Sequence, residues 1–158
     1  MSDSITLREL TETDLQSITD IEQQLNTFPW SYKNFSDCFV AGYPAWVLCE
    51  NLQVIGFIIV QKIVDELHLL NIGVQHSSQG KGLGRLLLDH IMSYGEEELC
   101  KTILLEVRAS NKRAQDLYLK NGFNEMSLRR DYYPAEQGRE DAVLMAKELS
   151  FLAFLGQN

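Results

Sequence analysis

The order of the expected secondary-structure elements predicts an α+β fold, with a mixed, mostly antiparallel central sheet flanked by helices. The patterns follow one another as strand, two helices, three strands, helix, strand, helix and two strands. A doubly wound sheet would alternate strand and helix along the whole chain, whereas this sequence does so only in its middle. At 158 residues the chain is about one domain long. We therefore expect a single domain over residues 1–149, followed by a short apolar tail over residues 150–158.

The first part of the chain predicts a strand and two helices. Residues 5–9 alternate between apolar and polar side chains, as a strand does. A helix follows, and Thr11, Thr13 or Asp14 can cap it. The side chains that share one face of this helix are Leu15, Ile18, Ile21, Glu22 and Leu25. Ser31 can cap a second, shorter helix.

Three strand-like runs come next, at residues 45–50, 54–64 and 66–74. Asn51 marks a turn between the first two runs, and residues 65–66 mark a turn between the second and the third. We therefore expect these runs to form an antiparallel meander.

The second half predicts two helices and three strands. One helix, over about residues 82–99, follows a glycine-rich loop. Ser110 or Asn111 can cap the other helix, which Asn121 and Gly122 would end. The strands are expected at residues 102–107, 123–132 and 142–149.

Charge is unevenly distributed along the chain, whose net charge is −8. Residues 1–70 carry ten acidic and three basic side chains, while ten of the fourteen Lys and Arg residues lie between Lys81 and Arg139. An acidic surface argues against nucleic acid as a direct ligand, because such binding depends on neutralising phosphates. The basic region suits a phosphorylated cofactor and the acidic remainder suits a basic partner, although both can also be ordinary solvated faces.

The cysteines and the apolar runs bear on the compartment. Cys38, Cys49 and Cys100 are odd in number and lack a CxxC spacing, so they are expected to be small, buried hydrophobic residues in a reducing compartment. The first residues show no signal peptide, and no apolar run is long enough to cross a bilayer. We expect a cytoplasmic protein that has no membrane partner.

The glycine-rich loop, residues 74–86, is the most informative stretch. It contains Gly80, Gly82 and Gly84 at alternate positions, just before a helix whose first N–H groups and dipole would face the loop. This arrangement predicts an anion site, most plausibly for phosphate. It is not a P-loop, because Arg85 and Leu86 stand where Lys-Ser or Lys-Thr is required, and it lacks the third glycine of the dinucleotide fingerprint. The alternative is a tight turn that only begins a helix.

The loop resembles the coenzyme-A pyrophosphate loop of the GCN5-related N-acetyltransferase (GNAT) family, through Gln79, Gly82 and Gly84. The order of the expected elements is also that of this family. Four further runs, at residues 28–31, 105–111, 130–134 and 138–142, resemble the family's RimI-type enzymes. These are N-terminal alanine acetyltransferases that act on a small-subunit ribosomal protein. The similarity covers about residues 5–149.

The resemblance implies acetyl-CoA as the co-substrate, no metal, and direct attack by the amine in a ternary complex. It implies Glu106 as the general base and Tyr118 as the general acid. Trp30 and Tyr133 are implied at the peptide entrance. The implied cofactor-binding residues are Ile72, Gly73, Val74, Gln79, Gly80, Lys81, Gly82, Leu83, Gly84, Arg85 and Asn111. At Gly80 the family more often carries a side chain, so the turn would be looser here.

Reaction chemistry gives independent support for these residue types. Acetyl transfer requires a neutral amine, a stabilised oxyanion and a proton for the departing thiolate. Neutralising an α-amine of pKa about 8 at pH 7 costs about 1.4 kcal/mol, against about 4.6 kcal/mol for a lysine, so a weak carboxylate base favours an N-terminal amine. A tyrosine of pKa about 10 is less acidic than a typical thiol, and full proton transfer from it to the thiolate would cost ~2 kcal/mol.

Each of these residues also has a purely structural interpretation. Glu106 can be a strand carboxylate paired with Arg108 or a nearby lysine, and Tyr118 can be a core aromatic side chain. Asn111 can be no more than a helix cap, and Trp30 can be an ordinary core residue. For the whole protein, the alternatives are an acetyltransferase for another amine (a lysine, a polyamine or a small metabolite), a non-catalytic coenzyme-A sensor and, least favoured, a dinucleotide reductase. The tail at residues 151–155 is expected to pack back onto the sheet rather than bind a partner.

Overall fold

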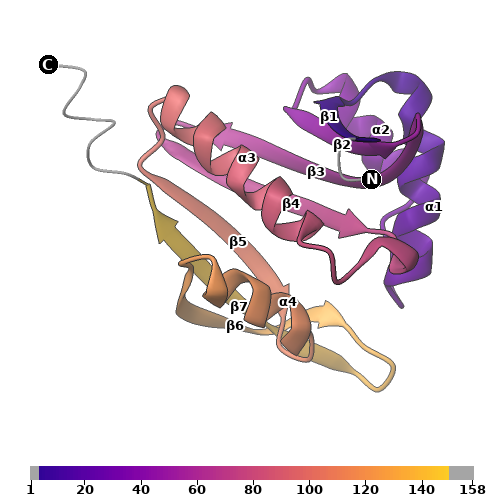
Figure 1. Cartoon of the computed structure of the whole chain (residues 1–158). Helices are drawn as coiled ribbons and strands as arrows, with labels where there is room; N and C mark the ends of the chain where they lie inside the picture. Colours follow the sequence, from indigo (N-terminus) through magenta and orange to yellow (C-terminus); the bar gives the residue numbers. More distant parts are fainter. Residues whose placement is uncertain (1–3, 150–158) are drawn as a thin grey trace, which may run out of the picture. The chain divides into compact units, whose positions relative to one another are not determined.

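The computed structural model describes residues 4–149, so the expected apolar tail lies outside the described residues. Its strands form one seven-stranded sheet in the order β1-β2-β3-β4-β5-β7-β6 (Figure 1). The strands are β1 (Ile5–Glu9), β2 (Ala45–Glu50), β3 (Gln53–Ile63), β4 (Glu66–Val74), β5 (Thr102–Arg108), β6 (Asn124–Pro134) and β7 (Arg139–Glu148). The helices are α1 (Leu15–Leu25), α2 (Tyr32–Val40), α3 (Leu83–Glu97) and α4 (Lys112–Lys120), with short 3-10 turns η2 (Glu12–Asp14) and η3 (His76–Ser78).

The sheet confirms the predicted α+β class. Strands β1 and β2, β2 and β3, β5 and β7, and β6 and β7 pair antiparallel. The parallel pair is β4 with β5, from Glu66 opposite Thr102 to Leu69 opposite Leu105. The sheet is therefore mixed and mostly antiparallel, as the element order predicts.

Contacts divide the chain into two compact units. Within the described residues, the first comprises residues 4–61 and 71–87, and the second comprises residues 62–70 and 88–149. The prediction of a single domain stays a prediction.

In the first unit, α1 and α2 pack against each other, beside the sheet strands β1 to β3 (Figure 1). Its core contains Ile18, Phe35, Val47 and Phe57, each at most 1% exposed. Burying side chains of this kind is the main driving force for folding.

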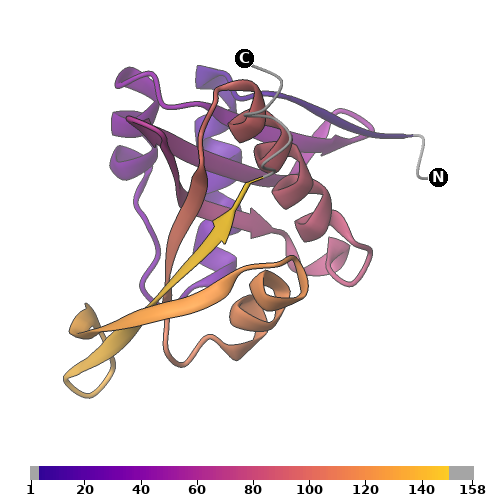
Figure 2. The same ribbon diagram turned by 90° about the vertical axis from the view of Figure 1, so that its left-hand side faces the viewer.

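In the second unit, β6 and β7 form a long hairpin, and helix α4 is joined directly to β6 (Figure 2). Tyr118 of α4 packs at 5.7 Å from Phe123, measured between ring centroids. Both are buried, as are Ile103 on β5 and Met145 on β7. Helix α4 thus contributes an aromatic side chain to the core formed by the ends of these strands.

The predicted helix caps are found at Ser31 and Asn111. The Ser31 hydroxyl accepts a hydrogen bond from the backbone N–H of Asn34, and the Asn111 side chain accepts one from Ala114. Asp14 acts differently from a simple cap, because its carboxylate accepts from the backbone N–H of Thr11 and pairs with Arg8 at 2.8 Å. This pairing lowers the pKa of the Asp14 carboxyl.

The last two strands run further towards their shared turn than the predicted ranges. Register shifts between Glu125 and Ser127, and between Arg129 and Tyr133, mark irregularities in β6. The predicted ranges leave Pro134 outside the strands, whereas β6 continues to Pro134. A proline is tolerated there because β6 is an edge strand of the sheet.

Three further expectations concern thiols, metals and membranes. Cys38, Cys49 and Cys100 are free; Cys49 and Cys100 are buried as predicted, whereas Cys38 is only partly buried. Among residues 4–149 no group of His, Cys, Asp and Glu could hold a metal ion. In the same part of the chain, no helix has the length and apolar character needed to cross a membrane.

Candidate active site

The end of β4 supplies the first part of the site, in the first unit. Gly73 and Val74 are buried. Gly73 lies close to neighbouring side chains. A Cβ at Gly73 would lie 2.7 Å from Cε1 of Phe57 and 3.1 Å from Cδ1 of Leu25. Glycine therefore lets the strand end approach Phe57 closely, at the residues expected to bind the pantetheine arm.

The glycine-rich loop begins with hydrogen bonds that fix its course. The backbone N–H of Gln75 donates to Ile55, and the chain then makes the turn η3, in which Ser78 is buried. The side-chain amide of Gln79 donates to the carbonyl of Val74 at 2.8 Å. This bond ties the loop back to the strand end, so the Gln79 side chain has a loop-closing role whether or not it also contacts a cofactor.

Gly80 and Gly82 both have φ of +80°, the left-handed region that favours glycine. A Cβ at either position would meet no atom within 4 Å. Backbone conformation, rather than crowding by the protein, therefore requires glycine here. The space beside the loop is open on the side where an added side chain would point.

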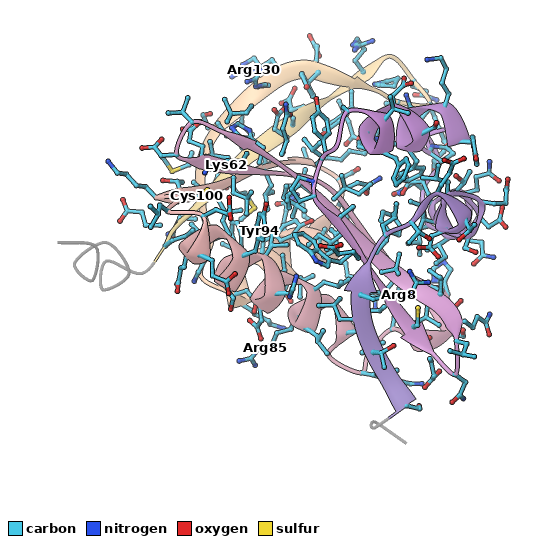
Figure 3. The ribbon with its side chains drawn as sticks, turned by 90° about the horizontal axis from the view of Figure 1, so that it is seen from above. Arg8, Lys62, Arg85, Tyr94, Cys100 and Arg130 are labelled. Atoms are coloured by element: carbon cyan, nitrogen blue, oxygen red, sulfur yellow. The ribbon has the colours of Figure 1, made fainter. Side chains whose placement is uncertain are left out.

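Helix α3 begins at Leu83, directly after the loop, and its first turn is closed by the bond from the Leu86 N–H to the Gly82 carbonyl. The N–H groups at the start of a helix have no acceptor within it, and the helix dipole is positive there. Lys81 and Arg85 are exposed beside this end, and Arg85 extends away from the helix (Figure 3). The loop and helix start therefore have the features of a phosphate site.

Glu106 lies on β5, in the second unit, with 28% of its side chain exposed. Its Oε2 atom is buried and accepts no hydrogen bond, although Nε of Arg129 lies 3.7 Å away. Buried carboxylate oxygens are normally hydrogen-bonded. An oxygen in this state can accept a hydrogen bond from an amine or from a water molecule.

Tyr118 is 6% exposed and fills the core position that its helical spacing predicts. Burial raises the pKa of its hydroxyl, and the nearby Tyr133 raises that pKa further. The hydroxyl therefore stays protonated at neutral pH. The hydroxyl is therefore suited to donating a hydrogen bond. Complete transfer of its proton costs more free energy than the reference pKa of tyrosine indicates.

Tyr133 lies near Glu106 and Arg108 at the end of the β6–β7 hairpin. Burial, followed by the charge of Glu106, raises the pKa of Tyr133 to about 12. The guanidinium carbon of Arg108 lies 4.5 Å from the centroid of its ring, a distance typical of a cation–π contact. The ring contact with Arg108 and the effect of the Glu106 charge both indicate that Tyr133 lies near the predicted general base.

An ion pair that the sequence does not reveal ties this hairpin to the end of β5. Arg108 pairs with Glu140 at 2.9 Å, and the second oxygen of Glu140 accepts the backbone N–H of Ser110. Arg108 also donates to the carbonyl of Pro134 at 2.6 Å. These contacts lower the pKa of the Glu140 carboxyl, first through the bond from Arg108. In the sequence, Glu140 is marked by its place in the run at residues 138–142. That run resembles the family, but it does not suggest what Glu140 does.

Trp30 is half-buried and contacts Phe35 at 5.1 Å between ring centroids. Its backbone N–H donates to the buried carboxylate of Glu22 at 2.9 Å. The helical pattern places Glu22 on one face of α1 but predicts no role for it. The signal that could have pointed to a role is that Glu22 is a charged residue on an otherwise apolar face.

The expected site residues fall into two groups. The first unit contains Trp30, the end of β4 and the glycine-rich loop, and the second contains Glu106, Asn111, Tyr118 and Tyr133. Asn111 is exposed and caps α4, so its expected structural role is confirmed. The functional assignments of all these residues stay predictions.

Comparison with known proteins identifies the class. A model of the acetyltransferase (GNAT) family matches residues 7–123, and the chain belongs to this family. It is 43% identical to the [ribosomal protein bS18]-alanine N-acetyltransferase of Escherichia coli (strain K12) over 145 residues, which are 92% of this chain and 98% of that protein.

Two further relatives agree with this match. The enzyme with the same name from Haemophilus influenzae is 42% identical, over 84% of this chain and 91% of its own length. The crystal structure of the ribosomal-protein-S18-alanine N-acetyltransferase from Escherichia coli superposes with a TM-score of 0.87, covering 93% of this chain and 95% of that one. The predicted family and fold are confirmed.

Proposed function

We propose that this protein is an N-terminal protein acetyltransferase that transfers an acetyl group from acetyl-CoA to the α-amino group of an N-terminal alanine. Its proposed substrate is a small-subunit ribosomal protein of the bS18 type. The observation that carries this proposal is the 43% identity, along 92% of the chain, to an enzyme named for that reaction. We treat residues 1–149 as one catalytic domain, and a ribosomal substrate would place the reaction in the cytoplasm.

The glycine-rich loop is assigned to the pyrophosphate of coenzyme A. Two left-handed glycines, open space beside them and the start of α3 support this assignment. Lys81 and Arg85 would add positive charge beside the pyrophosphate. The backbone of Ile72, Gly73 and Val74 would hold the pantetheine arm and donate to the thioester carbonyl.

Glu106 is assigned as the general base, acting directly or through a water molecule. Its buried oxygen without a hydrogen bond supports this role, because an acceptor of this kind can take the proton of the attacking amine. The carboxylate is a weak base, which matches an α-amine better than a lysine.

Tyr118 is assigned as the group that donates a hydrogen bond to the departing sulfur. Its raised pKa supports donation without ionisation at neutral pH. The new bond joins the amine nitrogen to the acetyl carbon, and the carbon–sulfur bond breaks. The nitrogen loses one proton to Glu106, and the thiolate, held by the Tyr118 hydrogen bond, takes up one proton from water. The amine attacks directly, and no acetylated side chain of this protein is required.

A peptide panel tests the function. Acetyl-CoA is offered with synthetic peptides that differ only in their first residue, together with a peptide of blocked N-terminus that contains lysine, and with spermidine. We expect acetylation of the alanine-first peptide, with a mass increase at its N-terminus. Acetylation of spermidine or of the internal lysine alone would indicate another amine as the substrate. Binding of acetyl-CoA without acetylation of any acceptor would contradict the enzymatic assignment.

A further inference from the structure

A buried carboxylate lies on α1 that the proposed reaction does not use. Glu22 is 2% exposed and lies beside Ile18 and Ile21, which are also buried. Its two oxygens accept separate hydrogen bonds, at 2.9 Å from the Asn26 side chain and at 2.9 Å from the backbone N–H of Trp30. Both donors belong to the segment that joins α1 to α2, which we call the α1–α2 loop (residues 26–31).

The position is unfavourable for a charged group that has only a packing role. Removing a carboxylate from water is costly unless hydrogen bonds compensate. Glu22 is also in the last turn of α1, which ends at Leu25, where the helix dipole disfavours negative charge. What the carboxylate gains in return is its two bonds to the α1–α2 loop. An apolar side chain would satisfy the core but would leave the N–H of Trp30 without this acceptor.

The α1–α2 loop carries exposed and half-buried aromatic side chains. Phe28 is 40% exposed, and the ring of Trp30 packs on Phe35, which in turn contacts Phe57 at 5.5 Å between ring centroids. Phe57 is the ring that Gly73 approaches closely. A row of aromatic contacts therefore leads from the α1–α2 loop to the strand end to which we assign the acetyl-bearing arm, all within the first unit.

We propose that Glu22 is a positioning residue for the acceptor peptide: it fixes the α1–α2 loop so that Phe28 and Trp30 form a rigid aromatic wall against the first side chain of the peptide. This inference rests on the proposed function. A rigid wall admits a small apolar side chain such as alanine and excludes larger ones. A loosened wall moves aside, so losing the carboxylate should relax the choice of the first residue.

The variant Glu22→Gln tests the role with little change in volume. In Glu22→Gln the glutamine NH2 group either opposes the Trp30 N–H or faces Asn26, whose amide must then turn over to offer its oxygen. In both cases the α1–α2 loop loses a charged acceptor. We expect the KM for an alanine-first peptide to rise on the order of ten-fold, consistent with the loss of one hydrogen bond to a charged group. The preference for alanine-first over leucine-first peptides, measured as a ratio of kcat/KM, should fall by a similar factor. The KM for acetyl-CoA should not change.

Two matched variants separate positioning from charge and from stability. Asp20→Asn removes the same charge from the same helix at an exposed residue that bonds with Gln16. With alanine-first and leucine-first peptides that carry no basic side chain, it should leave all of these constants unchanged. The double variant Glu22→Gln with Asn26→Asp exchanges donor and acceptor. The glutamine NH2 can then donate to the carboxylate introduced at position 26, while its oxygen accepts from Trp30, and the preference for alanine should return.

Hydrogen exchange gives a readout that does not depend on activity. In Glu22→Gln the amides of the α1–α2 loop should exchange faster, while those of β5 and α4 should be unchanged. A lower melting temperature with an unchanged first-residue preference and unchanged exchange in the loop would overturn the proposal. If the unaltered protein acetylates no peptide, the proposed function fails, and the exchange experiment still decides whether Glu22 anchors the loop.

Discussion

At the scale of single residues, the types of the proposed catalytic groups could be predicted, but their surroundings could not. The family resemblance suggests Glu106 and Tyr118, because it assigns roles to positions along the chain. Side chains that are distant in the sequence bury an oxygen of Glu106, which accepts no hydrogen bond. Such side chains also bury the Tyr118 hydroxyl and so raise its pKa. For the same reason the helical pattern places Glu22 on a helix face but does not predict its bonds to the following loop.

The first prediction concerns Glu106. Glu106→Gln keeps the size of the side chain but removes the acceptor for the amine proton. We expect kcat to fall by about 100-fold or more, within the usual range for loss of a general base. The Kd for acetyl-CoA should be nearly unchanged, as measured by calorimetry. Turnover equal to that of the unaltered enzyme would remove Glu106 from the mechanism.

The second prediction concerns Tyr118 and pH. Tyr118→Phe should lower kcat about 100-fold, because the departing thiolate loses a hydrogen-bond donor. A raised pKa means that the folded enzyme keeps this proton above about pH 10, where a free tyrosine begins to lose it. In the unaltered enzyme, ionisation of Tyr118 should therefore cause no fall in kcat between about pH 8 and about pH 10. A fall in kcat over this range that is present in the unaltered enzyme and absent in Tyr118→Phe would show that the hydroxyl ionises in the working range.

At the scale of secondary-structure elements, local signals predicted helix starts better than they predicted the ends of β6 and β7 at their shared turn. Ser31 and Asn111 cap their helices as expected, because a cap depends on bonds within one turn of the chain. The predicted boundaries of β6 and β7 were wrong, because their irregular register depends on the partner strand. Arg139 donates to the carbonyls of Asp131 and Tyr132, while Asp141 accepts the N–H of Asp131, and none of these bonds has a local signature.

The third prediction compares two glycines with the same backbone conformation. Gly82 and Gly138 have φ of +80° and +78°, and a Cβ at either would meet no atom within 4 Å. Alanine at either position should lower the free energy of unfolding by about 1–2 kcal/mol, the cost of a left-handed L residue. Only Gly82→Ala should also raise the Kd for acetyl-CoA, since Gly138 lies in the hairpin turn. Equal acetyl-CoA affinity in both variants would count against the pyrophosphate assignment.

The fourth prediction concerns the ion pair that holds the hairpin. Glu140→Gln should lower the free energy of unfolding at pH 7 by about 1–3 kcal/mol, because a charged acceptor loses its bonds to Arg108 and Ser110. The pKa of Glu140 is lowered by folding, so its stabilisation is present above its unfolded pKa and is lost as pH falls through the folded value. The variant should therefore lose less stability than the unaltered protein on acidification below about pH 4.3.

Glu136→Gln is the matched control for the ion pair. Glu136 is exposed and lies near the hairpin turn, so its replacement should leave the unfolding free energy within about 0.5 kcal/mol of the starting value. Denaturant titrations at pH 7 and at pH 3 measure both variants. Equal acid sensitivity of Glu140→Gln and the unaltered protein would show that the Arg108–Glu140 pair contributes no pH-dependent stability.

At the scale of the whole molecule, the order of elements along the chain could be predicted, but the order of the strands in the sheet was not predicted. Hydrophobic period and turn residues identify strands one by one. Nothing local states that β7 inserts between β5 and β6, because that pairing joins residues far apart in the chain, such as Thr102 and Glu148.

The fifth prediction follows from the charge of the whole chain. The net charge is −8, and residues 1–70 carry ten acidic side chains against three basic ones. A basic acceptor peptide should be attracted to this surface, and salt should weaken the attraction as the screening length falls from about 10 Å at 0.1 M towards about 3 Å at 1 M.

Two alanine-first peptides test this attraction, one with several lysines after the fourth residue and one with serines in their place. The KM of the basic peptide should rise several-fold as ionic strength increases from about 0.05 to about 0.5 M, whereas that of the serine peptide should be nearly constant. The kcat values should change little, since the chemistry is the same for both. A common salt dependence would mean that the acidic side chains do not contribute to peptide binding, and that selection depends on the first residues of the peptide alone.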